Sequence, residues 1–170
     1  TLDALPGGRN ILLFGEPWAA DVTAVEGSTA LGDKHGRGGL NPRIGWFCDD
    51  TRDSVKGSVM DASAPGYVNG GAEEFADDVF HALDGWRNTE SAPRQVGQLI
   101  QYVSAHDDLT LWDKLCLSMR GDRVLESDFD AFGSIDDILS ANVLAAGIVL
   151  TAAGLPPSLT HPRPSPPPPR

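Results

Sequence analysis

Two carboxylates in this chain each follow a short apolar run, and this placement is typical of acid–base chemistry. Glu16 comes directly after the run at 10–15, and a proline and a tryptophan follow it. Asp107 follows the run at 99–104, with His106 beside it. Apolar runs of this length predict buried strands, and α/β barrels hold their catalytic groups at the carboxyl ends of such strands. We therefore predict that Glu16 and Asp107 form a two-carboxylate site.

Glycoside hydrolysis is a reaction that commonly uses two carboxyl groups. One is protonated and donates its proton to the leaving oxygen, and the other is ionised and attacks the anomeric carbon. The proton donor needs a raised pKa, which an apolar and partly buried site supplies. Glu16 lies between Phe14 and Trp18 and fits that requirement. The alternative is a solvated surface glutamate.

The two runs and the segments around them resemble the type I pullulanases, the α-1,6-debranching members of glycoside hydrolase family 13, the α-amylase family. In that family Gly-Glu-(Pro or Gly)-Trp ends the fifth barrel strand. Tyr-Val-Ser-x-His-Asp ends the seventh, and a Leu-Thr-Leu-Trp-Asp-Lys-Leu run follows it. The matching segments here are 15–18, 102–107 and 109–115, while 41–47 and 50–58 look like the sixth strand and its helix. The resemblance covers roughly residues 9–155.

The resemblance implies roles for four residues. Glu16 corresponds to the general acid/base. Asp107 corresponds to an acid that does not attack but holds sugar hydroxyls, distorts the ring and stabilises the oxocarbenium-like state. His106 would donate to a sugar hydroxyl, and Trp18 would stack on a sugar face or shape that subsite; the alternatives are a surface His–Asp pair and a packed loop tryptophan. The family most often has Asn where this chain has Asp108, which adds a charge near the site.

The nucleophile of the family is an aspartate at the end of the fourth strand, and no residue of this chain can be assigned that role. The chain starts at Thr1 without a methionine, and its 170 residues fall short of the roughly 250 of a full barrel. We therefore expect a fragment that is inactive alone. It should form a partial (β/α)8 TIM barrel, an α/β fold that covers about the fifth to seventh strands and their helices.

The parent enzyme would hydrolyse α-1,6-glucosidic bonds in pullulan, starch or glycogen with retention. We expect no cofactor and no metal site. The partner would be a branched α-glucan, and uncovered barrel edges would favour self-association. Two alternatives stay open: an isoamylase-like or other α-glucan-active relative, and a non-catalytic gene fragment or binding module.

Strands and helices alternate along the chain, which predicts a parallel sheet. Helix 72–84 should bury Phe75, Val79, Phe80 and Leu83 on one face, and a capping-box pattern opens the helix at 134–153. Trp112 should belong to the core. The other expected elements are strands at 10–15, 43–48 and 99–104, helices at 50–57 and 109–119, and a Gly-rich loop at 27–39 over the active-site face.

The composition changes at Pro156, so we divide the chain into a barrel domain at 1–155 and a tail at 156–170. Eight of the last fifteen residues are proline, which predicts a disordered tail with polyproline II character. Such a tail could bind proline-recognition domains, or it could be a chain end translated out of frame or mis-assembled.

The formal net charge of −11 argues against nucleic acid as a partner and fits a neutral, polyhydroxylated substrate. The uncharged stretch at 138–160 is interrupted by Asn, Gly and Pro. Its continuous apolar part falls short of the roughly 20 residues that span a membrane, so it predicts a buried helix. Cys48 and Cys116 should be reduced, buried thiols. No targeting segment is visible, which leaves a cytoplasmic or an extracellular location open.

Overall fold

The computed structural model describes residues 2–18, 31–121 and 133–156. Three short strands form one parallel sheet in the order β1 (Leu13–Gly15), β2 (Ile44–Phe47) and β3 (Leu99–Ile100). Leu155 continues this order, because it pairs in parallel with Ile100 through a single bridge. The predicted mixed α/β fold with a parallel sheet is confirmed. The strands are shorter than the apolar runs, because only part of each run has a neighbouring strand to pair with.

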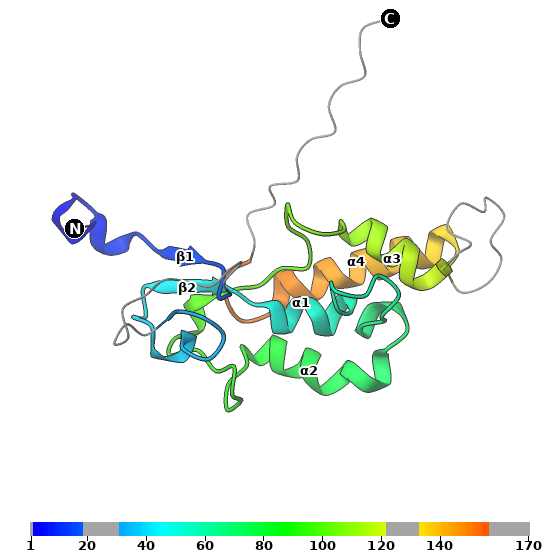
Figure 1. Cartoon of the computed structure of the whole chain (residues 1–170), viewed down its shortest axis with the longest axis horizontal. Coiled ribbons are helices and arrows are strands. Elements are labelled where there is room, and N and C mark those ends of the chain that lie inside the picture. Colours follow the sequence, from blue (N-terminus) through cyan, green and yellow to red (C-terminus); the bar gives the residue numbers. More distant parts are fainter. Residues whose placement is uncertain (1, 19–30, 122–132, 157–170) are drawn as a thin grey trace, which may run out of the picture.

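Four helices lie close to their predicted ranges: α1 (Asp49–Lys56), α2 (Ala72–Asp84), α3 (Leu111–Arg120) and α4 (Ile135–Thr151). Short 3₁₀ helices span Leu2–Ala4, Gly8–Asn10, Arg37–Gly39, Tyr67–Asn69 and Val96–Gln98. The predicted capping box is present at α4: the amide of Asp137 donates to the Ser134 hydroxyl at 3.1 Å, and the amide of Ser134 donates to the Asp137 carboxylate at 3.2 Å. The four helices gather on one side of the sheet, away from the amino-terminal segment (Figure 1).

The main core lies among the helices, with α4 packed against α3 and α1. Its members are Val55, Val79, Val103, Leu111, Leu115, Met119, Ile138, Ala141, Ala145, Ile148 and Val149. A second, smaller cluster joins the sheet to α2 through Trp46, Cys48, Ala82, Trp86 and Leu99. Because β2 and β3 contribute to this cluster, their carboxyl ends are held firmly.

Some side chains that the sequence assigns to the core lie at the surface. On α2, Val79 is buried, but Phe80 is 66% and Leu83 is 40% exposed. This helix contacts its neighbours along a narrow face, so Ala82 is buried in their place. Trp112 is 38% exposed, because the faces of α3 that meet the core carry other residues. Cys48 is buried as expected, whereas Cys116 is only partly buried.

The first strand is also exposed, contrary to the prediction of a buried strand. Leu13 is 48% and Phe14 is 59% exposed. β1 lies at the edge of the sheet and pairs with β2 alone among the described residues. Within the described ranges, no helix has both the length and the apolar character needed to cross a membrane. The predicted tail lies outside the described residues except for Pro156.

Candidate functional site

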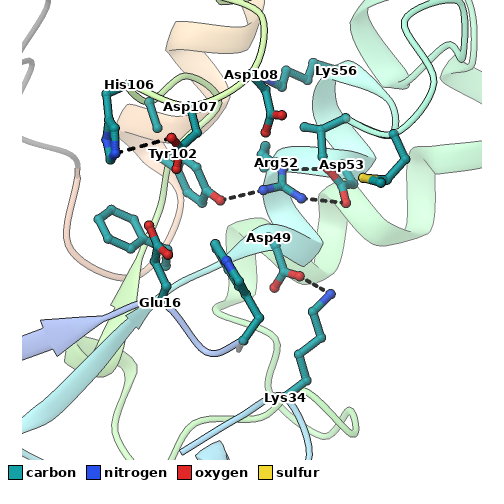
Figure 2. Close-up of a pocket in the computed structure, with 15 residues that line it drawn as sticks. Glu16, Lys34, Asp49, Arg52, Asp53, Lys56, Tyr102, His106, Asp107 and Asp108 are labelled. Atoms are coloured by element: carbon teal, nitrogen blue, oxygen red, sulfur yellow. Dashed lines mark hydrogen bonds and ion pairs between the residues drawn. The ribbon is translucent and has the colours of Figure 1, made fainter. Parts of the chain in front are cut away.

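A pocket of about 550 Å³ opens where the carboxyl ends of the strands meet (Figure 2). Each strand contributes to its wall through the residues that follow it. Glu16 and Trp18 come after β1, Asp49 comes after β2, and the stretch from Tyr102 to Asp108 comes after β3. The four predicted site residues, Glu16, Trp18, His106 and Asp107, therefore line one pocket.

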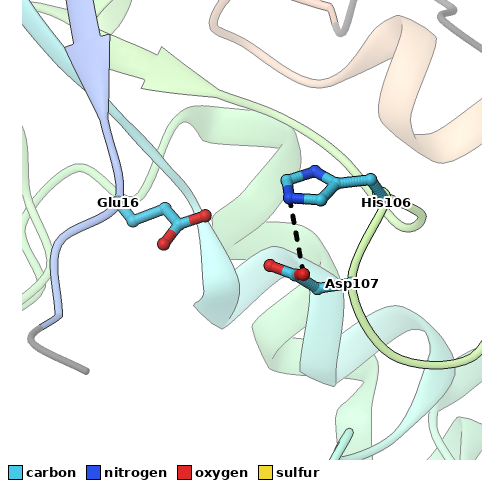
Figure 3. Close-up of side chains that lie close together, drawn as sticks. All are labelled: Glu16, His106 and Asp107. Carbon is cyan, nitrogen blue, oxygen red and sulfur yellow. Dashed lines mark ion pairs between the residues drawn. The ribbon is translucent and has the colours of Figure 1, made fainter.

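Glu16, His106 and Asp107 form a close group within this pocket. One polar side-chain atom from each lies within 4.8 Å of the other two, and His106 Nε2 is 3.4 Å from Asp107 Oδ1. Glu16 extends from the end of β1 toward the loop that carries the other two side chains (Figure 3). This arrangement can present two carboxyl groups and an imidazole to one ligand.

The surroundings of Glu16 differ from the prediction. The sequence predicts a partly buried, apolar position, but Glu16, His106 and Asp107 are all exposed. The reason is that β1 is an edge strand with an exposed Phe14, so little of the described chain covers Glu16. Carboxylate and imidazole groups are also metal ligands, and the spacing within this group would admit an ion.

Arg52 connects α1 to the chain segment that leads into the His106 loop. Its Nη1 donates to the Tyr102 hydroxyl at 2.8 Å, and its Nε and Nη2 donate to the Asp53 carboxylate at 2.7 and 2.9 Å. Burial opposes the charge of Arg52, but the hydrogen bonds to Asp53, together with electrostatic attraction from Tyr102, Asp53 and Asp49, outweigh burial and raise its pKa. Burial also raises the pKa of Tyr102 to about 12, so the phenol stays neutral at physiological pH.

Lys56 and Asp108 face each other across the upper part of the pocket in Figure 2. Lys56 is 2% exposed, and burial lowers its pKa to about 8; Arg52 nearby also lowers it, whereas Asp53 and Asp108 favour its charged form. Asp108 has a φ of 59°, a left-handed conformation that Asn and Asp tolerate better than most residues.

On the opposite side of the pocket, Asp49 pairs with two basic side chains, Arg37 and Lys34. Its side chain is 2% exposed and accepts a hydrogen bond from Arg37 Nη1 at 3.2 Å. Lys34, from the loop before β2, pairs with the other oxygen of Asp49 and lines the pocket. Arg37 also donates to the Ser91 hydroxyl at 2.9 Å, so three separate chain segments are joined here.

Sequence reasoning missed Lys34, Asp49, Arg52 and Lys56 as pocket residues. Asp49 could have been identified by the same pattern as Glu16, because it is an acid that closely follows a predicted strand. Arg52 and Lys56 are spaced i and i+4, with Asp49 three residues before, so the three share one face of α1. Nothing in the local pattern singles out Lys34. The predicted loop over the active-site face reaches the pocket through this lysine, and its residues 27–30 lie outside the described part of the chain.

The chain is similar in sequence to a pullulanase of Bacillus subtilis strain 168, with 34% identity over 157 residues. These residues make up 90% of this chain and 19% of that protein, so the chain spans about a fifth of this relative. No protein-family model matches the chain.

Solved structures of pullulanases have a similar fold. One is a type I pullulanase from Bacillus subtilis str. 168 complexed with maltose, with a TM-score of 0.66 and 31% identity over 85% of this chain and 19% of that chain. Another is the pullulanase from Anoxybacillus sp. LM18-11 complexed with maltotetraose, with a TM-score of 0.67 and 26% identity over 85% of this chain and 19% of that chain. In sequence and in fold, this chain is therefore of the pullulanase type and corresponds to one segment of those proteins.

Proposed function

We propose that this chain is a glucan-binding and catalytic part of an enzyme that hydrolyses α-1,6-glucosidic bonds in pullulan, starch or glycogen with retention. The observation that carries the proposal is the group of Glu16, His106 and Asp107, whose polar atoms lie within 4.8 Å of one another in one pocket. The group lies at the carboxyl ends of parallel strands, where (β/α)8 barrels place their sites. The sequential order of the strands supports a partial barrel of this kind.

In this proposal Glu16 donates a proton to the glycosidic oxygen as the bond to the anomeric carbon breaks, and later accepts a proton from the attacking water. Asp107 stabilises the positive charge that develops on the sugar ring. His106 donates to a sugar hydroxyl, and Trp18 contacts a sugar face. The carboxylate that attacks the anomeric carbon is expected to lie outside this chain, so the chain alone cannot form the covalent intermediate.

The runner-up function is glucan binding without hydrolysis. The exposure of Glu16 favours it, because a general acid is usually kept in a less solvated position. The same pocket serves both functions, so a binding arm and a catalytic arm are both needed in the test.

The binding arm titrates the chain with maltotetraose and follows binding by calorimetry or NMR. We expect binding, and we expect Asp107→Asn to weaken it about tenfold, the effect of losing one charge-assisted hydrogen bond of about 1.4 kcal/mol. Glu73→Gln, on the exposed face of α2, is the control and should have no effect. A wild-type chain that binds no α-glucan oligosaccharide would overturn the proposal.

The catalytic arm replaces the matching segment of the Bacillus subtilis pullulanase with this chain. We expect the chimera to release reducing ends from pullulan, and we expect Glu16→Gln in the chimera to lower kcat by about 10²- to 10⁴-fold. The isolated chain should release none. If the Glu16→Gln chimera keeps full turnover, Glu16 is not the general acid, and the binding function is then the better explanation of the pocket.

A further inference from the structure

Resting on the proposed function, we propose that Lys34, held by Asp49, forms a second sugar-binding position in the pocket. This position lies on the far side of the pocket from His106 and Asp107 (Figure 2). We infer that it selects α-glucan chains long enough to reach from the acid group to Lys34.

The support beneath Lys34 is rigid. The Asp49 carboxylate is 2% exposed. One of its oxygens pairs with Arg37, and the other pairs with Lys34. Arg37 is itself held by Asp50 at 2.5 Å and by Ser91, and its guanidinium lies 5.9 Å from the centre of the Trp46 ring. Charge-assisted hydrogen bonds of this kind fix geometry as well as adding energy, so Asp49 presents the Lys34 ammonium from a constant position.

The Lys34 ammonium still has donors to offer. Its side chain is 52% exposed, and an ammonium group carries three N–H donors. Asp49 is its sole ion-pair partner among the described residues. Sugar hydroxyls are good acceptors for the remaining donors, and a charged donor makes a stronger bond than a neutral one. A cation that is anchored on one side and open on the other is suited to binding a neutral, polyhydroxylated ligand.

A purely structural role explains the arrangement less well. Arg37 pairs with Asp49 from within the protein, whereas Lys34 reaches Asp49 from the pocket side. The pocket of about 550 Å³ is also well within the size range of small-molecule sites, so a ligand at the acid group can extend toward Lys34.

The experiment compares the affinities of maltose and maltotetraose for the wild-type chain and three variants. We expect Lys34→Met to weaken maltotetraose binding about five- to tenfold, the range for one charge-assisted hydrogen bond, and to leave maltose binding within about twofold. Lys34→Arg should restore most of the affinity. Arg87→Met removes an exposed cation whose partner is Asp84, away from the pocket, and should change neither affinity. Equal melting temperatures would show that all variants are folded.

The outcomes separate this inference from the proposed function. If the wild type binds maltotetraose and Lys34→Met binds it equally well, or if both sugars weaken alike, the second position is refuted while the proposed function stands. If the wild type binds neither sugar, the proposed function fails, and the second position fails with it.

Discussion

Replacing Lys56 by methionine should make the protein more stable at neutral pH, whereas the same replacement of Lys114 should make it less stable. Both lysines are buried, at 2% and 1% exposure. Lys114 Nζ donates to three backbone carbonyls in the first part of the loop after α1, at 2.5–3.2 Å. Lys56 Nζ has no hydrogen bond or ion pair among the described residues. The ammonium group of Lys114 therefore has hydrogen-bond acceptors in the folded protein. The ammonium group of Lys56 has lost much of its water and has gained no hydrogen-bond partner among the described residues.

The size of the effect follows from the pKa of Lys56, which burial and Arg52 lower from 10.5 to about 8 despite Asp53 and Asp108. Between these pH values the unfolded chain holds the proton more tightly than the folded chain, so stability rises as the pH increases through this window. One pKa unit corresponds to about 1.4 kcal/mol, which sets an upper limit of about 3 kcal/mol for the destabilisation at pH 7. Because the ammonium lines the pocket and keeps some contact with water, we expect about 1–3 kcal/mol.

The assay is urea unfolding followed by tryptophan fluorescence at pH 7 and pH 9. Lys56→Met should unfold at higher urea than the wild type at pH 7, and the difference should narrow by about 1 kcal/mol at pH 9, where the wild-type amine is largely neutral. Lys114→Met should lose about 2–4 kcal/mol, because three partly buried carbonyls lose their partner. A Lys56→Met protein that is less stable at pH 7, or a difference that does not change with pH, would refute this account of Lys56.

Three further expectations follow from the exposed strand, the thiols and the acid group. Leu13→Lys places a charge on the open edge of β1 and should reduce self-association, measured by light scattering over a range of concentrations; an unchanged mass would locate the contact elsewhere. Burial raises the pKa of Cys48 to about 11, so Cys48 should react with a thiol reagent at pH 8 at least about tenfold more slowly than Cys116; equal rates would contradict its burial. Addition of 1 mM calcium or zinc should leave the melting temperature unchanged, whereas a metal site with a Kd a hundredfold lower would add about 2.7 kcal/mol and would reveal an ion at Glu16, His106 and Asp107.

The helices were the most predictable part of the fold. Helix α2 agrees with its predicted range of 72–84. Helix α4 (Ile135–Thr151) starts one residue after and ends two residues before its predicted range of 134–153. Their periodic apolar residues and their caps are local signals, and local signals can be found in a sequence. The four site residues were also predicted to lie together, because acids that follow parallel strands meet at one edge of the sheet.

The exposure of Phe14 and Phe80 and the contacts of Lys34 could not be predicted in the same way. Whether an apolar residue is buried depends on the neighbouring element, and β1 has a neighbour on one side only among the described residues. The pairing of Lys34 with Asp49 joins a loop to a helix fifteen residues later, and no periodicity links them. Such contacts are consequences of the tertiary fold and are visible only in the structure.

The order of the strands has a consequence for how the chain assembles. β2 pairs with β1, and β3 pairs with β2. Leu155 then adds one bridge to Ile100 of β3. No strand pairing in the described residues skips a neighbour, although each parallel pair, such as Leu13 with Ile44 and Trp46 with Leu99, closes a long connection, which slows folding. During synthesis the sheet can therefore grow in the order in which the ribosome releases the strands. At each stage the newest edge is the surface that the next strand will join, and it is also the surface that another nascent chain could pair with first.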